Sequence, residues 1–119
     1  FVNIFLNAVQ AMHKGGKLFI RSYSKEIDKP KEKVGKRNGD YFRFGEKVVV
    51  VEIEDTGIGI PKEHMGKVFD PFFTTKGPQE GTGLGLSVTR NILHMHRGLI
   101  EIESEENKGT KVIITLKIV

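Results

Sequence analysis

The 119-residue chain contains no cysteine, which excludes disulfide bonds and thiolate chemistry. It has no apolar run long enough to cross a membrane as a helix, and no signal-peptide pattern. Internal repeats and low-complexity tracts are also missing from the sequence. With 38% hydrophobic and 29% charged residues, the composition is typical of one globular domain with a modest core.

Positive charge is in small excess and is unevenly placed. The formal net charge is +4, and three of these charges come from the segment Lys25 to Lys47, which holds eight Lys or Arg against five Asp or Glu. The remainder is nearly neutral, which argues against a nucleic-acid-binding face over the whole domain. The basic stretch Lys29 to Arg37 leaves nucleic-acid binding as a minor alternative, and a steep salt dependence would be its signature.

The first residues, "FVNIFLNAVQAM", predict a helix that is apolar nearly all round and is therefore expected to be buried. Its polar residues Asn3, Asn7 and Gln10 form a single stripe at helical spacing, and buried amides need hydrogen-bond partners. Gly15 or Gly16 is expected to cap its end. Because the chain opens within this helix and without Met, we expect it to be part of a longer protein.

The run "KVVVVEIED", Lys47 to Asp55, predicts a strand whose apolar face ends in a carboxylate. Side chains alternate along a strand, so every second residue from Val49 to Asp55 shares one face. An inward carboxylate is costly unless something hydrogen-bonds it. Either the protein's own turn, which follows through Gly57 and Gly59, or a ligand must fill that role.

The remaining segments alternate between strands and helices. "LFIRSYSKEI" from Leu18 predicts a strand, and the charged segment 25–47 a long hairpin connection. Helical spacing follows Pro61, which suits a first helical position, and then "TTKGPQEGTGLG" predicts a mobile loop. A helix from Leu84 has one face with Val88, Ile92 and Met95, and Gly98 is its expected stop.

Two final strands, "LIEIESE" and "TKVIITLKIV", are joined at the turn signal "NKG". In the second, Thr110 shares the face of the apolar residues, so this strand begins with a polar residue on its core side. Paired strands with helices between them predict an α+β fold: a mixed, mostly antiparallel sheet with helices on one face.

The glycine-rich stretch "GTGLGLS" precedes a helix, where free backbone N–H groups and the helix dipole favour an anion. It is not a P-loop, because no Gly-Lys-Ser/Thr follows, and no strand leads into it as a dinucleotide fingerprint requires. By itself the stretch is a weak phosphate-binding signal.

Taken together, the motifs resemble those of the ATP-binding catalytic domain of sensor histidine kinases. This domain belongs to the wider GHKL-type ATPase group, which includes DNA gyrase and the heat-shock chaperone. "NIFLNAVQA" is similar to its N box, "DTGIGI" to its G1 box, "FDPFFTTK" to its F box and "GTGLGLS" to its G2 box, while "NKGTKVIITL" resembles its closing strand pair. "FDPFFTTK" is especially similar to the nitrogen-regulator type. Only segment 25–47 lies outside the resemblance.

The resemblance implies a two-layer α/β sandwich of the Bergerat type that binds Mg²⁺-ATP. Asn7 matches the Mg²⁺ ligand, and Asn3 supports the phosphate side. Asp55 matches the carboxylate that accepts the adenine amino proton, and Thr110 the hydroxyl that helps to hold that carboxylate or a water. Lys76 matches a phosphate contact in the lid. The full nucleotide-binding set expected is Asn3, Asn7, Asp55, Gly57, Gly59, Ile60, Thr74, Thr75, Lys76, Gly81, Thr82, Gly83, Leu84, Gly85, Leu86 and Thr110.

Each of these residues has an alternative reading. Asp55 could cap the following turn, Asn7 could be a core amide, Thr110 an ordinary strand-end residue and Lys76 a solvated lysine; the glycines could form a plain tight turn. Three aromatic residues are expected to anchor the lid rather than touch nucleotide: Phe69, Phe72 and Phe73. The histidines are expected to be surface or packing residues without a zinc site: His13, His64, His94 and His96.

One departure concerns catalysis. Gyrase-type relatives carry a glutamate, the general base, one turn before the Mg²⁺ asparagine, whereas this chain has Asn3, which cannot act as a base. The resemblance therefore implies transfer of the γ-phosphoryl group to a histidine on a separate helical dimerisation domain of the same protein, and onward to a response regulator. A hydrolytic ATPase and a nucleotide-sensing module are the alternatives. We expect residues 1–119 to form one catalytic domain that lacks the N-terminal start of its fold. We expect this domain to lie in the cytoplasm, and any membrane anchor to belong to other domains of the full-length protein.

Overall fold

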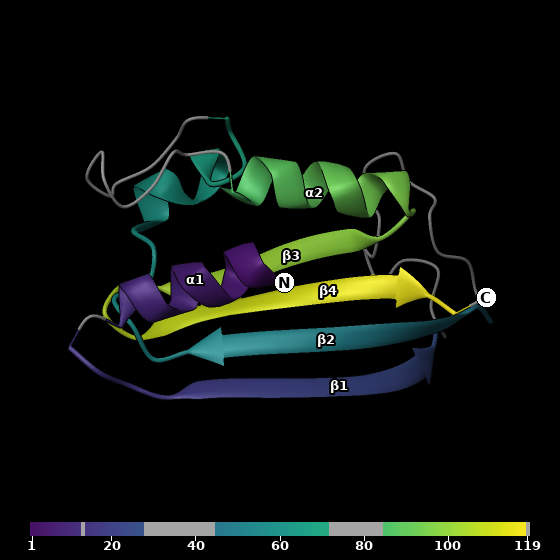
Figure 1. Cartoon of the computed structure of the whole chain (residues 1–119), viewed down its shortest axis with the longest axis horizontal. Coiled ribbons are helices and arrows are strands. Elements are labelled where there is room, and N and C mark those ends of the chain that lie inside the picture. Colours follow the sequence, from purple (N-terminus) through teal and green to yellow (C-terminus); the bar gives the residue numbers. More distant parts are fainter. Residues whose placement is uncertain (13, 28–44, 72–84, 119) are drawn as a thin grey trace.

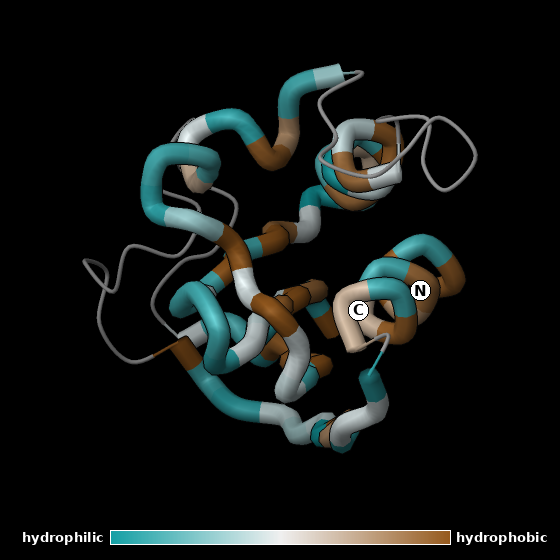
Figure 2. Tube along the Cα trace, turned by 90° about the vertical axis from the view of Figure 1, so that its left-hand side faces the viewer, coloured by the Kyte–Doolittle hydropathy of each residue, from teal (hydrophilic) through white to brown (hydrophobic). Residues whose placement is uncertain are grey.

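A computed structural model describes residues 1–12, 14–27, 45–71 and 85–118. Four antiparallel strands form one sheet in the order β1-β2-β4-β3, and both α-helices lie on the same face of it (Figure 1). The end-on view in Figure 2 shows the same two layers. The predicted α+β sandwich is confirmed, with purely antiparallel pairing among the described strands. The elements are α1 (Val2–Ala11), β1 (Leu18–Glu26), β2 (Lys47–Asp55), a 3₁₀ helix (Lys62–Lys67), α2 (Gly85–Met95), β3 (Leu99–Glu105) and β4 (Gly109–Lys117).

The main core lies between the helices and the sheet. Ile4 of α1 packs with Ile53 of β2, and Val112 and Ile114 of β4 complete the centre with Ile100 of β3. In the sheet register Ile53 lies opposite Val112, and Ile114 opposite Ile100, so these side chains share one face. This is the face on which the sequence placed Asp55.

The opposite face of the sheet has its own smaller apolar cluster. Val48 and Val50 of β2 are buried there with Ile27, and Leu99 and Ile113 pack against them. The alternation along β2 assigned the side chains to the two faces correctly, but it did not show that the second face is also buried. Buried positions therefore occur on both faces of β2, and Glu52 is one of them, with 9% of its surface exposed.

The expectation that the first helix is buried all round is wrong. Ile4 and Ala8 are buried, whereas Val2, Leu6 and Val9 are exposed. A helix that lies on a sheet buries only the stripe that faces the sheet, and no described element covers the outer side of α1. The helix ends at Ala11 with Met12 as its cap, ahead of the two glycines that were expected to cap it.

The apolar stripe of α2 also points away from the core. Val88, Ile92 and Met95 are exposed, and Leu93 and Ser87 turn toward the sheet instead. The helix stops three residues before Gly98. Arg97 takes the left-handed conformation at φ 57°, which lets the Gly98 N–H donate to the Leu93 carbonyl at 2.7 Å.

The segment after Pro61 is a six-residue 3₁₀ helix rather than an α-helix, and Pro61 precedes it as the cap instead of occupying its first position. Val68 and Phe69 follow the 3₁₀ helix and pack inward, so the apolar spacing reflects contact with the core more than helix periodicity. Residues 28–44 of the expected hairpin connection (25–47) and residues 74–84 of the expected lid loop lie outside the described residues.

We expect Gly59→Ala to lower the free energy of unfolding by about 2–4 kcal/mol, because two costs combine. Gly59 has φ +72°, which an L-residue adopts with strain, and an added Cβ would clash with the Glu105 carbonyl oxygen. Urea unfolding followed by circular dichroism measures the loss. Gly66→Ala is the matched control, because its position has an ordinary φ and open space, and it should change stability by less than about 0.5 kcal/mol. Equal effects of the two substitutions would contradict this account.

We expect Glu52→Gln to destabilise the fold in a pH-dependent way. The Tyr23 hydroxyl donates to Glu52 at 2.7 Å and holds the pKa of that carboxyl below its usual range, with Arg21 acting in the same direction. A lowered folded-state pKa means that the ionised carboxylate stabilises the fold above the ordinary glutamate pKa and loses this effect as the pH falls through the folded value.

Glu52→Gln should therefore cost about 1–3 kcal/mol at pH 7, and the difference from wild type should shrink as the pH falls below about 4. Denaturant titrations at several pH values measure it. Glu54→Gln, at the exposed neighbouring residue, is the control and should leave the free energy of unfolding nearly unchanged at every pH. A loss that is the same at pH 7 and pH 3 would rule out ionisation as the cause.

Candidate nucleotide-binding site

Asp55 lies where the sequence placed it, at the end of the helix-covered face of β2, with 7% of its surface exposed. Its Oδ1 accepts a hydrogen bond from the Gly57 N–H at 2.8 Å, so the turn-capping role is present. Burial raises the pKa of Asp55, and the backbone N–H groups of Gly57 and Thr110 oppose that rise. A carboxylate has about four lone-pair sites, so Asp55 can accept a further hydrogen bond from a ligand beside these backbone N–H groups.

The turn after Asp55 packs against the end of α1. An added Cβ on Gly57 would lie 2.5 Å from the Ala11 carbonyl oxygen, and the Ile58 N–H donates to that same oxygen at 3.0 Å. Thr56 ties the turn to the start of β1, since its Oγ1 accepts from the Lys17 N–H at 2.9 Å. The glycine at position 57 is thus required by contact with α1 itself.

The far side of the turn is held by the β3–β4 hairpin. The Asn107 N–H donates to the Ile58 carbonyl at 2.6 Å, and the Ile60 N–H donates to Ser104 Oγ at 2.8 Å. Ser104 in turn donates to the Gly109 carbonyl at 2.8 Å. The turn is therefore clamped between α1 and the hairpin, which fixes Asp55 in place.

Thr110 lies directly opposite Asp55 in the sheet register. Its hydroxyl hydrogen-bonds Ser104 at 2.9 Å, and its backbone N–H, not its side chain, acts on the Asp55 carboxylate. The sequence analysis did not identify Ser104 as a site residue. A serine on the inner face of a strand gives no local sign that its hydroxyl will connect Ile60 with Gly109.

The asparagine stripe of α1 faces the beginning of α2. The Asn3 amide Nδ2 donates to the Gly85 carbonyl at 3.4 Å, and the Thr89 hydroxyl donates to the same oxygen at 2.7 Å. Asn7 lies one turn further along α1 and is half-buried. The fold thereby brings two predicted motifs, 82 residues apart at Asn3 and Gly85, to one place.

Phe69 anchors the start of the predicted lid to the core, as expected, since it packs against the main apolar cluster. The Arg90 guanidinium stacks over its ring at 4.8 Å from the centroid, a cation–π contact that sequence reasoning did not find. No local pattern links these two residues. Gly85 and Leu86 open α2 and are half-buried.

Several predicted residues lie outside the described part of the chain, and their roles stay predictions. They are His13, Phe72, Phe73, Thr74, Thr75, Lys76, Gly81, Thr82, Gly83 and Leu84.

The described histidines have no arrangement that suggests metal chemistry. His96 hydrogen-bonds the Ile92 carbonyl through Nδ1 at 2.9 Å at the end of α2, and His94 is exposed on the same helix. Within residues 1–12, 14–27, 45–71 and 85–118, no group of three or more His, Asp or Glu side chains is placed to hold a metal ion. No described helix is both long and apolar enough to span a membrane.

A magnesium ion carried by a nucleotide makes different demands from a protein-only metal site. Mg²⁺ typically takes one or two protein oxygens and fills its other positions with phosphate oxygens and water. The half-buried Asn7 amide fits that requirement, because it lies one helical turn from Asn3, which contacts Gly85 at the N-terminal end of α2, where the positive end of the helix dipole favours phosphates. Asp55 lies near the other end of α1, because the turn that follows it packs against Ala11. The carboxylate is suited to a polar base, and the amides near the start of α2 are suited to an anionic group.

Comparison with known proteins agrees with these motifs. The family described as histidine kinase-, DNA gyrase B-, and HSP90-like ATPase matches residues 1–119. Sporulation kinase E of Bacillus subtilis is 35% identical over 99% of the chain, and sensor kinase CckA of Brucella abortus is 41% identical over 97%. The chain spans only 13% and 12% of the lengths of these two curated relatives.

Solved structures show the same fold. The nucleotide-free catalytic domain of histidine kinase ThkA is 34% identical, with a TM-score of 0.66 over 98% of this chain and 62% of that one. The mycobacterial sensor histidine kinase MprB has a TM-score of 0.70 at 23% identity, covering 98% of this chain and 66% of that one, and supports the fold alone. The expected nitrogen-regulator subtype stays a prediction. The chain belongs to the ATP-binding histidine kinase-, DNA gyrase B-, and HSP90-like ATPase family.

Proposed function

We propose that this chain is the ATP-binding catalytic domain of a two-component sensor histidine kinase, which transfers the γ-phosphoryl group of Mg²⁺-ATP to a histidine on a separate helical domain. The observation that carries the proposal is Asp55: a buried carboxylate that the backbone N–H groups of Gly57 and Thr110 clamp in place, and whose oxygens have lone pairs that can accept further hydrogen bonds. The names of the curated relatives, which are sensor and sporulation kinases, support the same reading.

In this proposal the nucleotide lies between α1, the turn after β2 and the N-terminus of α2. The adenine amino group donates to Asp55, and Ile60 packs on the base. The phosphates lie toward Asn3, Asn7 and the start of α2, where the helix dipole and free N–H groups stabilise them. Asn7 would hold Mg²⁺, which neutralises phosphate charge when it is bound.

The polar residues of α1 that face this phosphate end are amides, and an amide cannot deprotonate water. Histidine near neutral pH is already largely a neutral nucleophile and needs no strong base. The domain then contributes positioning and charge stabilisation, which supply most of the catalysis in phosphoryl transfer. The predicted contacts at Thr74, Thr75, Lys76 and Gly81 to Leu84 would close over the phosphates.

The acceptor histidine, the dimerisation domain that carries it and the response regulator are the partners proposed for the full-length protein. The curated relatives are about four to eight times as long as this chain, which leaves room for such domains. We place this domain in the cytoplasm, and we assign residues 1–119 to one catalytic domain.

Phosphotransfer with γ-³²P-labelled ATP tests the proposal. The chain is mixed with Mg²⁺ and the histidine-bearing helical domain from the same protein, and acid-labile label should appear on that domain. A helical domain with the acceptor histidine changed to Gln is the control and should stay unlabelled. ATP hydrolysis without transfer would identify a hydrolytic ATPase instead, and binding with neither reaction would identify a nucleotide-sensing module.

A further inference from the structure

Arg90 is a cation of α2 without an anionic partner among the residues that the structure describes. It is half-buried, and its guanidinium lies over the Phe69 ring, with Cζ 4.8 Å from the ring centroid. Its Nε is buried and makes no hydrogen bond within the described ranges, and no ion pair between described residues includes it. Among these residues, the stack on Phe69 is therefore the contact that fixes the head group of Arg90.

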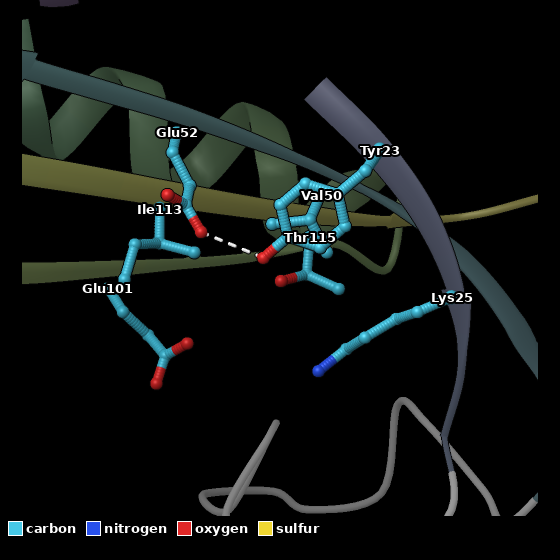
Figure 3. A pocket seen from close by; sticks show the side chains of 7 residues that line it. All are labelled: Tyr23, Lys25, Val50, Glu52, Glu101, Ile113 and Thr115. Atoms are coloured by element: carbon cyan, nitrogen blue, oxygen red, sulfur yellow. Dashed lines mark hydrogen bonds between the residues drawn. The ribbon is translucent and has the colours of Figure 1, made fainter. Parts of the chain in front are cut away.

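The cations on the opposite face of the sheet are paired in the ordinary way. Arg21 donates to Glu52, and Lys111 Nζ lies 3.8 Å from the same carboxylate. Figure 3 shows this carboxylate, which also accepts from the Tyr23 hydroxyl. A buried guanidinium N–H without an acceptor costs free energy, and Arg90 has this cost. Satisfying its own charge therefore does not explain where Arg90 lies.

The stack joins α2 to the segment that follows the 3₁₀ helix. Phe69 belongs to that segment and packs against the main apolar core, so the ring has a fixed place. Arg90 lies in the second turn of α2, close to the first turn at Gly85, whose carbonyl accepts from the Asn3 amide of α1. A planar guanidinium on an aromatic face has a defined orientation. The contact therefore fixes the beginning of α2 relative to the core.

We propose that Arg90 is a positioning residue for the phosphates of the nucleotide, and that it acts through Phe69. The stack holds the first turn of α2 where its free N–H groups and its dipole meet the phosphates. Without the stack, this end of the helix can shift, and contacts that depend on exact positions become weaker. The inference rests on the proposed nucleotide site and adds to it a residue that need not touch the nucleotide.

Isothermal titration calorimetry with Mg²⁺-ATP tests this role, with circular dichroism as the check on folding. Arg90→Met removes the cation but keeps a long side chain, and it should weaken ATP binding about 3- to 10-fold, the range expected for one cation–π contact. Phe69→Leu removes the ring and should weaken binding to a similar extent. The double variant should bind about as well as the weaker single variant, because both changes break one contact. Arg90→Lys should recover most of the affinity, because an ammonium can also lie over the ring.

Arg97→Met is the matched control, since Arg97 is exposed just beyond the other end of α2, and it should leave the ATP affinity unchanged. Arg90→Gln replaces Arg90→Met if that variant does not fold. A loss in Arg90→Met that Phe69→Leu does not share would indicate direct contact with the nucleotide and overturn the positioning role. Additive losses in the double variant would overturn it too, as would ATP affinities that no variant changes. Absence of ATP binding by the wild type would instead refute the proposed nucleotide site, and this inference with it.

Discussion

Asp55→Asn should weaken ATP binding about 10- to 100-fold, which is the loss expected for one hydrogen bond to a charged group. Asparagine can keep its side-chain oxygen on the Gly57 N–H, so the turn should survive. The second carboxylate oxygen becomes an NH₂ group, however, which would meet the adenine amino group donor to donor. Preference for ATP over GTP should fall with the affinity, because guanine presents an acceptor at the corresponding position.

Isothermal titration calorimetry with ATP and GTP measures both changes, and circular dichroism checks the fold. Glu54→Gln is the matched control, because Glu54 is the preceding residue of the same strand and is itself exposed. It removes a charge at nearly the same place without touching the turn. If Asp55→Asn binds ATP as well as wild type while its fold is intact, Asp55 is only a turn cap and the proposed base site is wrong.

Asn3→Glu should raise the basal rate of ATP hydrolysis, although the wild-type chain should hydrolyse ATP very slowly. Asn3 is exposed and contacts the Gly85 carbonyl at the start of α2, so a carboxylate there would face the proposed phosphate end. A well-placed general base contributes typically ~10²–10⁴-fold. The gain should be smaller than this, because a grafted base lacks the supporting contacts that orient it.

Single-turnover hydrolysis at saturating Mg²⁺-ATP compares wild type, Asn3→Glu and Asn3→Gln. The glutamine variant has the length of glutamate without its basicity, so it separates proton abstraction from steric effects. Brisk hydrolysis by the wild type would favour a dedicated ATPase over the kinase. Slow hydrolysis by all three would show that residue 3 does not occupy the position of the base.

The burial of Asp55 could be predicted because it depends on a local property. Alternation along β2 assigns Asp55 to the face of Val49, Val51 and Ile53 without knowledge of any other strand. The inward position of Thr110 followed from the same rule applied to β4, whereas its pairing with Asp55 across the sheet was given only by the strand register. The alternation rule could not predict that the Thr110 hydroxyl hydrogen-bonds Ser104, because Ser104 belongs to a third strand, β3.

Helix faces were harder to predict than strand faces in this chain. An apolar residue on nearly every side of α1 leaves no periodic signal to distinguish the inner stripe at Ile4 and Ala8 from the exposed stripe at Leu6 and Val9. In α2 the apolar spacing indicated the helix correctly but not the direction it faces. Orientation is decided by packing against the sheet, which a helix's own sequence specifies only weakly.

By itself, the sequence determined the order of elements, the inward position of Asp55 and the family, because motif spacing and strand alternation are properties of the chain alone. The tertiary structure decided which groups meet: Asn3 with Gly85, Arg90 with Phe69, and Glu52 with Arg21 and Tyr23. These contacts join residues 21 to 82 positions apart. Their formation depends on strand register and helix placement, which are set by packing of the whole domain rather than by any local pattern.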